Sequence, residues 1–193
     1  MIINVSENKD YFSQRNNFLK PMESCNVTSM VMALHYLGYT FPKGIYSQPE
    51  DNLRAYIESK GMNPEIHDQL SKGTNEWIGK RVTEFKTNIP IPTIIDNILI
   101  KKPVVLSGTF PGYPTRRTSP LGHIVTLVGL EWKDQTPEGQ LDQPIAVIID
   151  DPYGNTMNSC QGKGNDIKIS WNLFIEWMKP CGNTSVKWGH LFL

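Results

Sequence analysis

Apolar residues in the first third of the chain recur at helical spacing. Between residues 26 and 37 they lie three or four positions apart, and Gly38 follows at a position typical of a helix end. Further on, Ser47 and Glu50 form a capping-box pattern around Pro49, and proline suits a first helical turn. The pattern therefore predicts two helices in this part of the chain.

The second of these helices should end near Gly61, after which the pattern weakens. Residues 64–88 show no clear period, which predicts a mixture of helix and loop. Apolar positions at 94, 95, 98 and 99 then predict another short helix, opened by Pro92 and closed before Pro103.

Beyond Pro103 the pattern changes from helical to extended. Five segments are rich in β-branched residues and bounded by Pro, Gly or Asn, which predicts strands. They are PVVLSG (103–108), HIVTLVGLEW (123–132), IAVIID (145–150), DIKIS (166–170) and SVKWGHLFL (185–193). Between the last two, SWNLFIEWM predicts a short helix with Ser170 as its cap.

Helices that come first and strands that follow are the order of an α+β domain, in which N-terminal helices pack on an antiparallel sheet. The 193 residues suit one domain with a hydrophobic core, and no repeat, low-complexity tract or linker divides them. We therefore expect a single domain spanning residues 1–193.

Composition narrows the class of partner. Lys plus Arg and Asp plus Glu each number 19, so the formal net charge is zero. Because nucleic acids and anionic membranes attract concentrated positive charge, we expect neither as a partner. Arg116 and Arg117 are a local exception in the predicted loop 110–122, which also carries Tyr113. This loop is either a rim for substrate or an ordinary solvated loop.

The N-terminal stretch MIINVSENKDYFSQ lacks the basic and apolar regions of a signal peptide. No apolar run approaches the ~20 residues that a membrane-spanning helix needs. We therefore expect a soluble protein made in the cytoplasm, which could leave the cell by lysis or as part of a virus particle.

Three cysteines are present: Cys25, Cys160 and Cys181. They fit three reduced thiols, or one free thiol beside a pair formed by Cys160 and Cys181. No CxxC or HxxxH motif occurs and the four histidines are scattered, so the sequence predicts no metal site.

Cys25 stands immediately ahead of the first helical pattern. A helix start favours a thiolate, because the macrodipole and the free backbone N–H groups point toward it. A buried structural cysteine is the other interpretation, since free cysteine is among the most buried residue types.

Two further residues could complete thiol chemistry. His123 opens a predicted strand directly after Gly122, and Asp151 closes the next strand just before Pro152. If these strands pair as a hairpin, His123 and Asp151 lie near the same edge of the sheet, where a carboxylate can orient an imidazole. The alternatives are a polar strand cap for His123 and turn initiation for Asp151.

Three blocks of the chain occur together in a recognisable order. They are YFSQRNNFLKPMESCNVTSMVMALHYLG, GHIVTLVGL, and IIDDPYGN followed by DIKISWNLFIEW. From about residue 11 to the last strand, the chain resembles papain-like cysteine peptidases related to the bacteriocin-leader-processing peptidases. It is most similar to their stand-alone bacterial and phage relatives. The resemblance implies a papain-like fold, cleavage of peptide bonds and no cofactor.

The resemblance also implies a role for each candidate residue. Cys25 would be the nucleophile, His123 the general base and then acid, and Asp151 the carboxylate that orients the imidazole. Gln14 would place its side-chain amide beside the Cys25 backbone N–H, where a tetrahedral intermediate needs donors. Asp150 points to the opposite face of its strand, so we expect Asp151 to be the partner of His123.

The chain departs from the family pattern on both sides of its cysteine. In that pattern the glutamine lies six residues before the cysteine, whereas the interval from Gln14 to Cys25 is 25 − 14 = 11 residues. Position 19, six residues before, is Leu19, whose side chain cannot donate. Asn26 follows the cysteine where many relatives carry glycine.

Three functions fit these residues. The first is a cysteine-dependent hydrolase that cleaves a peptide or protein substrate through a thioester acyl-enzyme, as the resemblance implies. The second is an amidase or a transglutaminase-like acyl transferase that uses the same residues. The third is a binding or inhibitory module that keeps the fold without catalysis. We expect the first function.

Overall fold

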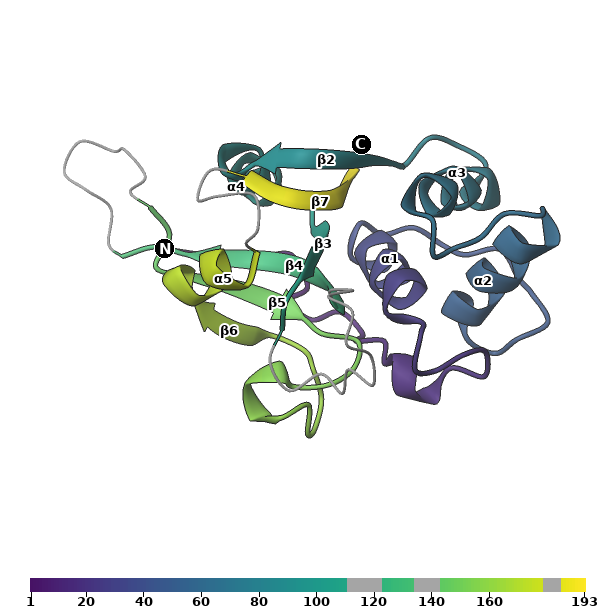
Figure 1. The fold of residues 1–193 in the computed structure, drawn as a ribbon, viewed down its shortest axis with the longest axis horizontal. Coiled ribbons are helices and arrows are strands. Elements are labelled where there is room, and N and C mark those ends of the chain that lie inside the picture. The colour runs from purple at the N-terminus through teal and green to yellow at the C-terminus, as the bar shows by residue number, and fades with distance from the viewer. Residues whose placement is uncertain (111–122, 134–142, 179–184) are drawn as a thin grey trace.

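A computed structural model describes residues 1–110, 123–133, 143–178 and 185–193 (Figure 1). Within these ranges the α-helices are α1 (Cys25–Tyr36), α2 (Pro49–Ser59), α3 (His67–Ile78), α4 (Ile91–Leu99) and α5 (Trp171–Met178). The strands are β1 (Ile2–Asn4), β2 (Thr83–Pro90), β3 (Val104–Gly108), β4 (His123–Glu131), β5 (Ala146–Asp150), β6 (Ile167–Ser170) and β7 (Ser185–Phe192). Short 3₁₀ helices, η1 (Gln14–Asn16) and η2 (Thr156–Asn158), lie in the connections.

The described strands form one antiparallel sheet in the order β2-β7-β3-β4-β5-β6, and β1 pairs with the far end of β4. β4 and β5 pair antiparallel, with Thr126 opposite Asp150. The two strands therefore lie side by side as the sequence predicts, which brings His123 and the residue that follows Asp150 to the same end of the sheet.

Helices cover both faces of this sheet (Figure 1). Side chains along β4 alternate between the two faces: Val125 and Leu127 join the core that includes α4 and α5, whereas Ile124 and Val128 contact the side of α1. Because both faces are covered, β4 is a nearly continuous apolar run in sequence. The predicted α+β class, with N-terminal helices packed on an antiparallel sheet, is confirmed.

The cysteine-bearing helix has the predicted bounds to within a residue. α1 begins at Cys25, and Gly38 follows its C-terminus with φ of +81°, a left-handed conformation that glycine adopts without strain. The helix at residues 94–99 and the five predicted strands are also present. The Ser170 hydroxyl accepts a hydrogen bond from the Leu173 backbone N–H at 3.4 Å, which agrees with its predicted place at the start of α5.

Two details of the predicted elements are wrong, and one short strand was not predicted. Ser47 does not cap α2, because the N-cap residue is Gln48, whose side chain makes no capping hydrogen bond. Glu50, the other residue of the predicted capping box, is buried. Residues 64–88 contain α3 and most of β2, whose alternation is hidden because the strand lies at the sheet edge and its middle residues are exposed. β1 has three residues, too few to set a pattern.

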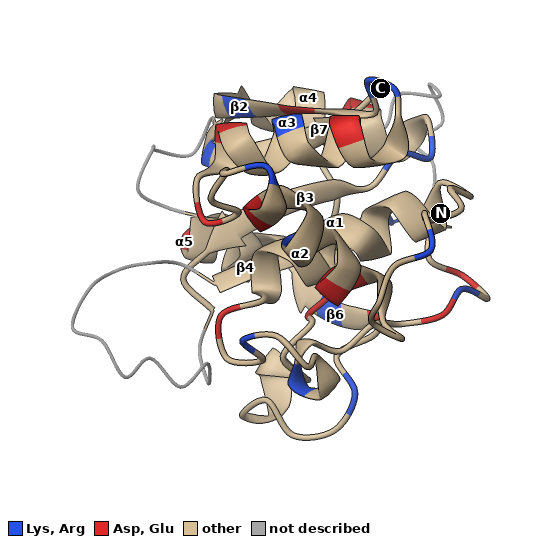
Figure 2. Cartoon of the chain, turned by 90° about the vertical axis from the view of Figure 1, so that its right-hand side faces the viewer, with Lys and Arg blue, Asp and Glu red and all other residues tan. Residues whose placement is uncertain are grey.

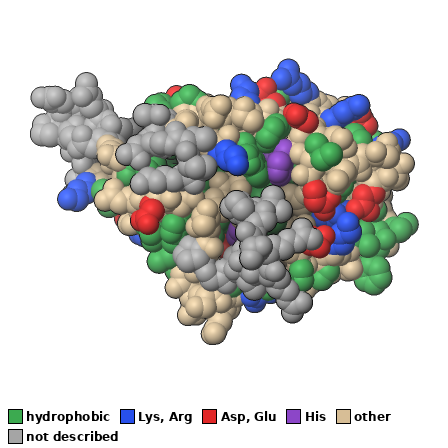
Figure 3. All heavy atoms as spheres, in the orientation of Figure 1, with side chains coloured by type: hydrophobic (Ala, Val, Ile, Leu, Met, Phe, Trp, Pro, Cys, Tyr) green, Lys and Arg blue, Asp and Glu red, His purple; other side chains and the backbone are tan. Residues whose placement is uncertain are grey.

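Charged residues of both signs occur along α2 and α3 (Figure 2). On the face seen in Figure 3, charged side chains of both signs are intermixed with apolar ones. No helix among the described residues is long and apolar enough to cross a membrane. Residues 111–122, which include Tyr113, Arg116 and Arg117, fall outside the described ranges, as does Cys181.

Candidate active site

Cys25 is the first residue of α1, so its side chain lies at the positive end of the helix macrodipole. The thiol is free and partly exposed, and it packs against the hydrophobic cluster beneath α1. Ser24, the N-cap residue, makes no side-chain cap. Its hydroxyl donates instead to the carbonyls of Leu19 and Lys20, at 2.9 and 2.6 Å.

His123 and Asp151 form a buried pair at the end of the sheet. The imidazole Nε2 lies 2.5 Å from the Asp151 Oδ1, and the two side chains are 1% and 0% exposed. Burial disfavours the imidazolium, but the charge and hydrogen bond of Asp151, together with a hydrogen bond to Cys25, outweigh burial and raise the pKa of His123 to about 9. Because Nε2 is paired with Asp151, Nδ1 is the ring nitrogen that remains for the thiol.

The structure therefore brings Cys25, His123 and Asp151 together from three separate elements: the start of α1, the start of β4 and the end of β5. An imidazole held between a carboxylate and a thiol is the arrangement that thiol chemistry requires. In this setting the imidazole is charged at neutral pH.

The position of Asp151 is fixed through its backbone as well as its side chain. Its N–H donates to the carbonyl of Gly164 and its carbonyl accepts from the Tyr11 hydroxyl, at 2.8 and 2.6 Å, while the Tyr153 N–H donates to Oδ1 at 2.8 Å. A Cβ at Gly164 would lie 1.9 Å from the Asp151 carbonyl oxygen, so only glycine allows this approach.

Asp150, the neighbour in sequence, has different partners. Its carboxylate accepts from the Tyr36 hydroxyl and from the Asp166 N–H, each at 2.6 Å, on the α1 side of the sheet. Burial is the main cause that raises the pKa of Asp150 to about 6. The structure thus places Asp151, and not Asp150, against His123.

Gln14 is fully buried in η1, beside the turn that follows Asp151. Its backbone N–H donates to the Pro152 carbonyl at 2.9 Å, and its side-chain Nε2 donates to the Pro21 carbonyl at 2.8 Å. Gln14 therefore links the Asp151 turn to the segment that leads into Cys25. One amide N–H of its side chain is used in doing so.

Asn26, which follows the cysteine, has a structural contact of its own. Its Nδ2 donates to the Pro64 carbonyl at 2.7 Å, and its Oδ1 accepts from the Val27 N–H at 2.8 Å. The asparagine thereby ties the first turn of α1 to the chain that leads into α3.

Two aromatic rings flank the imidazole of His123. The rings of Phe110 and Tyr153 lie nearly perpendicular to it, with centroids 5.9 and 6.5 Å away. The Arg15 guanidinium lies over the Tyr153 ring, 4.5 Å from its centroid. No sequence pattern points to Phe110 or Tyr11, because their contacts are with residues distant along the chain.

The other cysteine in the described ranges is Cys160. Its thiol is free and buried, and burial is the main cause that raises its pKa. The predicted alternative of a pair with Cys181 falls outside the described residues. No group of three or more potential metal ligands occurs in the part of the chain that the structure describes.

The remaining buried histidine, His190 on β7, lies away from this site. Its Nε2 is 3.4 Å from the Nδ1 of His67, and the ring centroids of Trp188 and His67 are 3.8 Å apart, with the rings tilted by 35°. Burial lowers the pKa of His190 to about 3 and that of His67 to about 4. Both are neutral at physiological pH.

Comparisons with known proteins bear on the fold and on the family of this chain. The crystal structure of a protein described as a candidate C39-like peptidase from Bacillus anthracis superposes with a TM-score of 0.61, over 100% of this chain and 98% of that one, at 16% sequence identity. This likeness concerns the fold. A search of curated protein sequences found no match. The model of the peptidase C39-like family matches residues 6–175, and the chain therefore belongs to the peptidase C39-like family.

Proposed function

We propose that this protein is a cysteine peptidase that hydrolyses a peptide or amide bond through a thioester intermediate. The observation that carries the proposal is the buried pair of His123 and Asp151 beside a cysteine at a helix N-terminus. An imidazole with a pKa of about 9 is protonated at neutral pH, and a protonated imidazole stabilises a neighbouring thiolate.

In the first half of the reaction, the Cys25 thiolate attacks the carbonyl carbon of the substrate and forms a C–S bond. The His123 imidazolium then gives its proton to the leaving nitrogen as the C–N bond breaks. In the second half, His123 accepts a proton from water as the water oxygen attacks the thioester. The acid product leaves and the thiolate with its imidazolium is restored. Asp151 holds the ring and stabilises its charged form throughout.

The negative charge of each tetrahedral intermediate needs hydrogen-bond donors. We assign this role to the Cys25 backbone N–H and to the second Nε2 proton of Gln14, the first being donated to Pro21. The assignment is supported by the burial of Gln14 beside the Asp151 turn. A displaced donor of this kind typically costs ~10²–10³ in rate.

The test is product analysis by mass spectrometry after incubation with a mixed peptide library, with wild type compared with Cys25→Ala. Cys160→Ala is the matched control, because it removes the other free thiol of the described residues. New peptide termini that need Cys25 but not Cys160 would support the proposal.

Parallel incubations contain glycine methyl ester as an amine acceptor, and peptidoglycan fragments as an alternative substrate. Products carrying the added amine would favour an acyl transferase, and cleavage confined to peptidoglycan fragments would favour a cell-wall amidase. A folded wild type that gives no Cys25-dependent product would instead favour a binding module.

A further inference from the structure

Residues 17–24 lie between η1, which carries Gln14, and Cys25. Gln14 and Cys25 are the two residues that we propose as hydrogen-bond donors to the oxyanion. This is also where the chain departs from its family pattern, because the interval of 11 residues is longer than the six of that pattern. The structure contains a distinctive support for this segment, which we call the oxyanion loop. The support comes from one face of α2.

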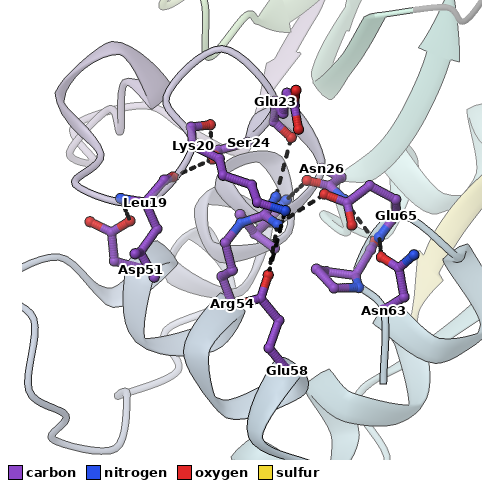
Figure 4. Close-up of polar contacts among 12 residues, drawn as sticks. Leu19, Lys20, Glu23, Ser24, Asn26, Asp51, Arg54, Glu58, Asn63 and Glu65 are labelled. Carbon is purple, nitrogen blue, oxygen red and sulfur yellow. Dashed lines mark hydrogen bonds and ion pairs between the residues drawn. The ribbon is translucent and has the colours of Figure 1, made fainter. Parts of the chain in front are cut away.

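Asp51, in the first turn of α2, holds the beginning of the oxyanion loop. Its Oδ2 accepts the Phe18 N–H and its Oδ1 accepts the Leu19 N–H, each at 2.8 Å (Figure 4 shows the contact with Leu19). The Asp51 residue is only 2% exposed. Hydrogen bonds from backbone N–H groups to an ionised carboxylate are stronger than neutral ones, and two on one carboxylate fix both position and orientation.

Arg54 lies three residues later on the same face of α2 and holds the end of the oxyanion loop. Its Nη2 donates to the Glu23 carbonyl at 3.2 Å, two residues before Cys25 (Figure 4). Its Nη1 pairs with Glu65 and Glu58 at 2.9 and 3.2 Å. These two glutamates balance the positive charge of the guanidinium, so this charge does not depend on Asp51. The Arg54 side chain is 1% exposed.

The oxyanion loop is also closed on itself. The Glu23 N–H donates to the Lys20 carbonyl at 2.9 Å, where Lys20 has a φ of +46°, and the Ser24 hydroxyl joins the same turn. The Gln14 amide donates to the Pro21 carbonyl within this turn. A shift of the turn against α2 would therefore move the Gln14 side chain and the first amide of α1 together.

We propose that Asp51 and Arg54 are positioning residues that set the oxyanion loop, and with it the Gln14 amide and the Cys25 backbone N–H, for transition-state stabilisation. This inference rests on the proposed function. Among the residues that the structure describes, the partners of these two side chains include neither the thiol nor the imidazole. Their removal should therefore weaken stabilisation of the oxyanion while leaving the pair of Cys25 and His123 intact.

Two reagents separate these effects. Alkylation by iodoacetamide needs the thiolate but forms no oxyanion, whereas acylation by p-nitrophenyl acetate passes through a tetrahedral oxyanion before p-nitrophenolate leaves. We expect Asp51→Asn to lower the acylation rate constant by ~10–100-fold, because a small displacement of a catalytic donor has effects of this size. The iodoacetamide rate at each pH should stay within about twofold of wild type.

Asp68→Asn is the matched control, since Asp68 is an exposed acid in the first turn of another helix, α3. It should leave both rates unchanged. Arg54→Lys is the second variant, in case Asp51→Asn does not fold by circular dichroism. It keeps the positive charge near Glu65 but loses the fork that reaches the Glu23 carbonyl, and it should give the same selective loss.

The outcomes distinguish the inference from the function on which it rests. Suppose that the wild type shows an acylation burst. Equal losses of both rates in the folded variants, or no loss of either rate, would then overturn the positioning role but not the proposed function. A wild type without a Cys25-dependent burst would contradict the proposed function, and the positioning role would fail with it.

Discussion

His123 on β4 and His190 on β7 are buried side chains of one sheet, and each lies close to a second ionisable group. For His190 that group is His67, and burial lowers the pKa of both imidazoles, to about 3 and about 4. For His123 it is the carboxylate of Asp151, and the pKa is raised to about 9 despite burial. The identity of the partner, and not burial, decides whether the ring carries a charge.

The two histidine pairs consequently make opposite contributions to stability as pH changes. A raised folded-state pKa, as at His123, stabilises the fold fully below an unfolded pKa of ~6.5, and this contribution is lost as pH rises through about 9. A lowered pKa, as at His190 and His67, stabilises the fold above pH ~6.5, and this contribution is lost as pH falls toward about 4. Only the first pair suits acid and base chemistry near neutral pH.

Removal of the charge of Asp151 should produce the largest change. In Asp151→Asn the imidazole stays buried without a carboxylate, so we expect the pKa of His123 to fall below 6.5 and to resemble that of His190. The acylation rate at pH 7 should fall by ~10³–10⁴, as expected when a triad carboxylate becomes an amide. Stopped-flow acylation and NMR titration of the ring measure the two effects. A ring that still titrates near pH 9 would contradict this account of the pair.

The pH profile of wild type should show the next largest effect. The value of kcat/KM should decline as pH rises through about 9, approaching tenfold per pH unit, because a neutral His123 cannot protonate the leaving nitrogen. The same measurement on Asp151→Asn should show this decline at lower pH. A profile that stays flat to pH 10 would mean that His123 does not act as the acid.

The neutral pair can be tested through stability. Denaturant unfolding of wild type and His190→Phe at pH 7 and pH 5 compares the change in the free energy of unfolding between the two pH values. We expect the wild type to lose about 1–2 kcal/mol more than the variant over this interval, since His190 must become charged when the protein unfolds at low pH. Equal losses would mean that His190 is not held neutral.

Asp150→Asn should have the smallest effect on activity. This substitution changes a buried carboxylate beside Asp151 that contacts Tyr36 and Asp166 and not His123. We expect the acylation rate to stay within about threefold of wild type, while the free energy of unfolding changes by about 1–3 kcal/mol. A loss of activity as large as in Asp151→Asn would remove the distinction between the two adjacent acids.

The sequence alone was sufficient to predict the elements that carry the candidate site. Cys25 precedes a helical pattern, and His123 and Asp151 stand at the ends of strands that are apolar enough to be recognised. Pairing of the two strands places His123 near Asp151. The position of Cys25 beside them was implied only by the family resemblance, because strand pairing does not say how the first helix packs on the sheet.

The support of the oxyanion loop could not be predicted in this way. Asp51 looks like an ordinary acid in a first helical turn, where a negative charge is expected for local reasons. Its actual partners, Phe18 and Leu19, lie more than 30 positions earlier in the chain and donate only through their backbone N–H groups. Every residue except proline has such a group, so no sequence pattern marks these two as partners. The edge strand β2 was missed for a related reason, since its exposed centre resembles a loop.

The most direct test of the central claim is the pH dependence of Cys25 alkylation by iodoacetamide, in wild type and in His123→Ala. A thiolate paired with the His123 imidazolium predicts rapid labelling at pH 6 that is lost in the variant. Slow labelling with the profile of an ordinary thiol in both proteins would contradict the claim that His123 and Asp151 activate this cysteine.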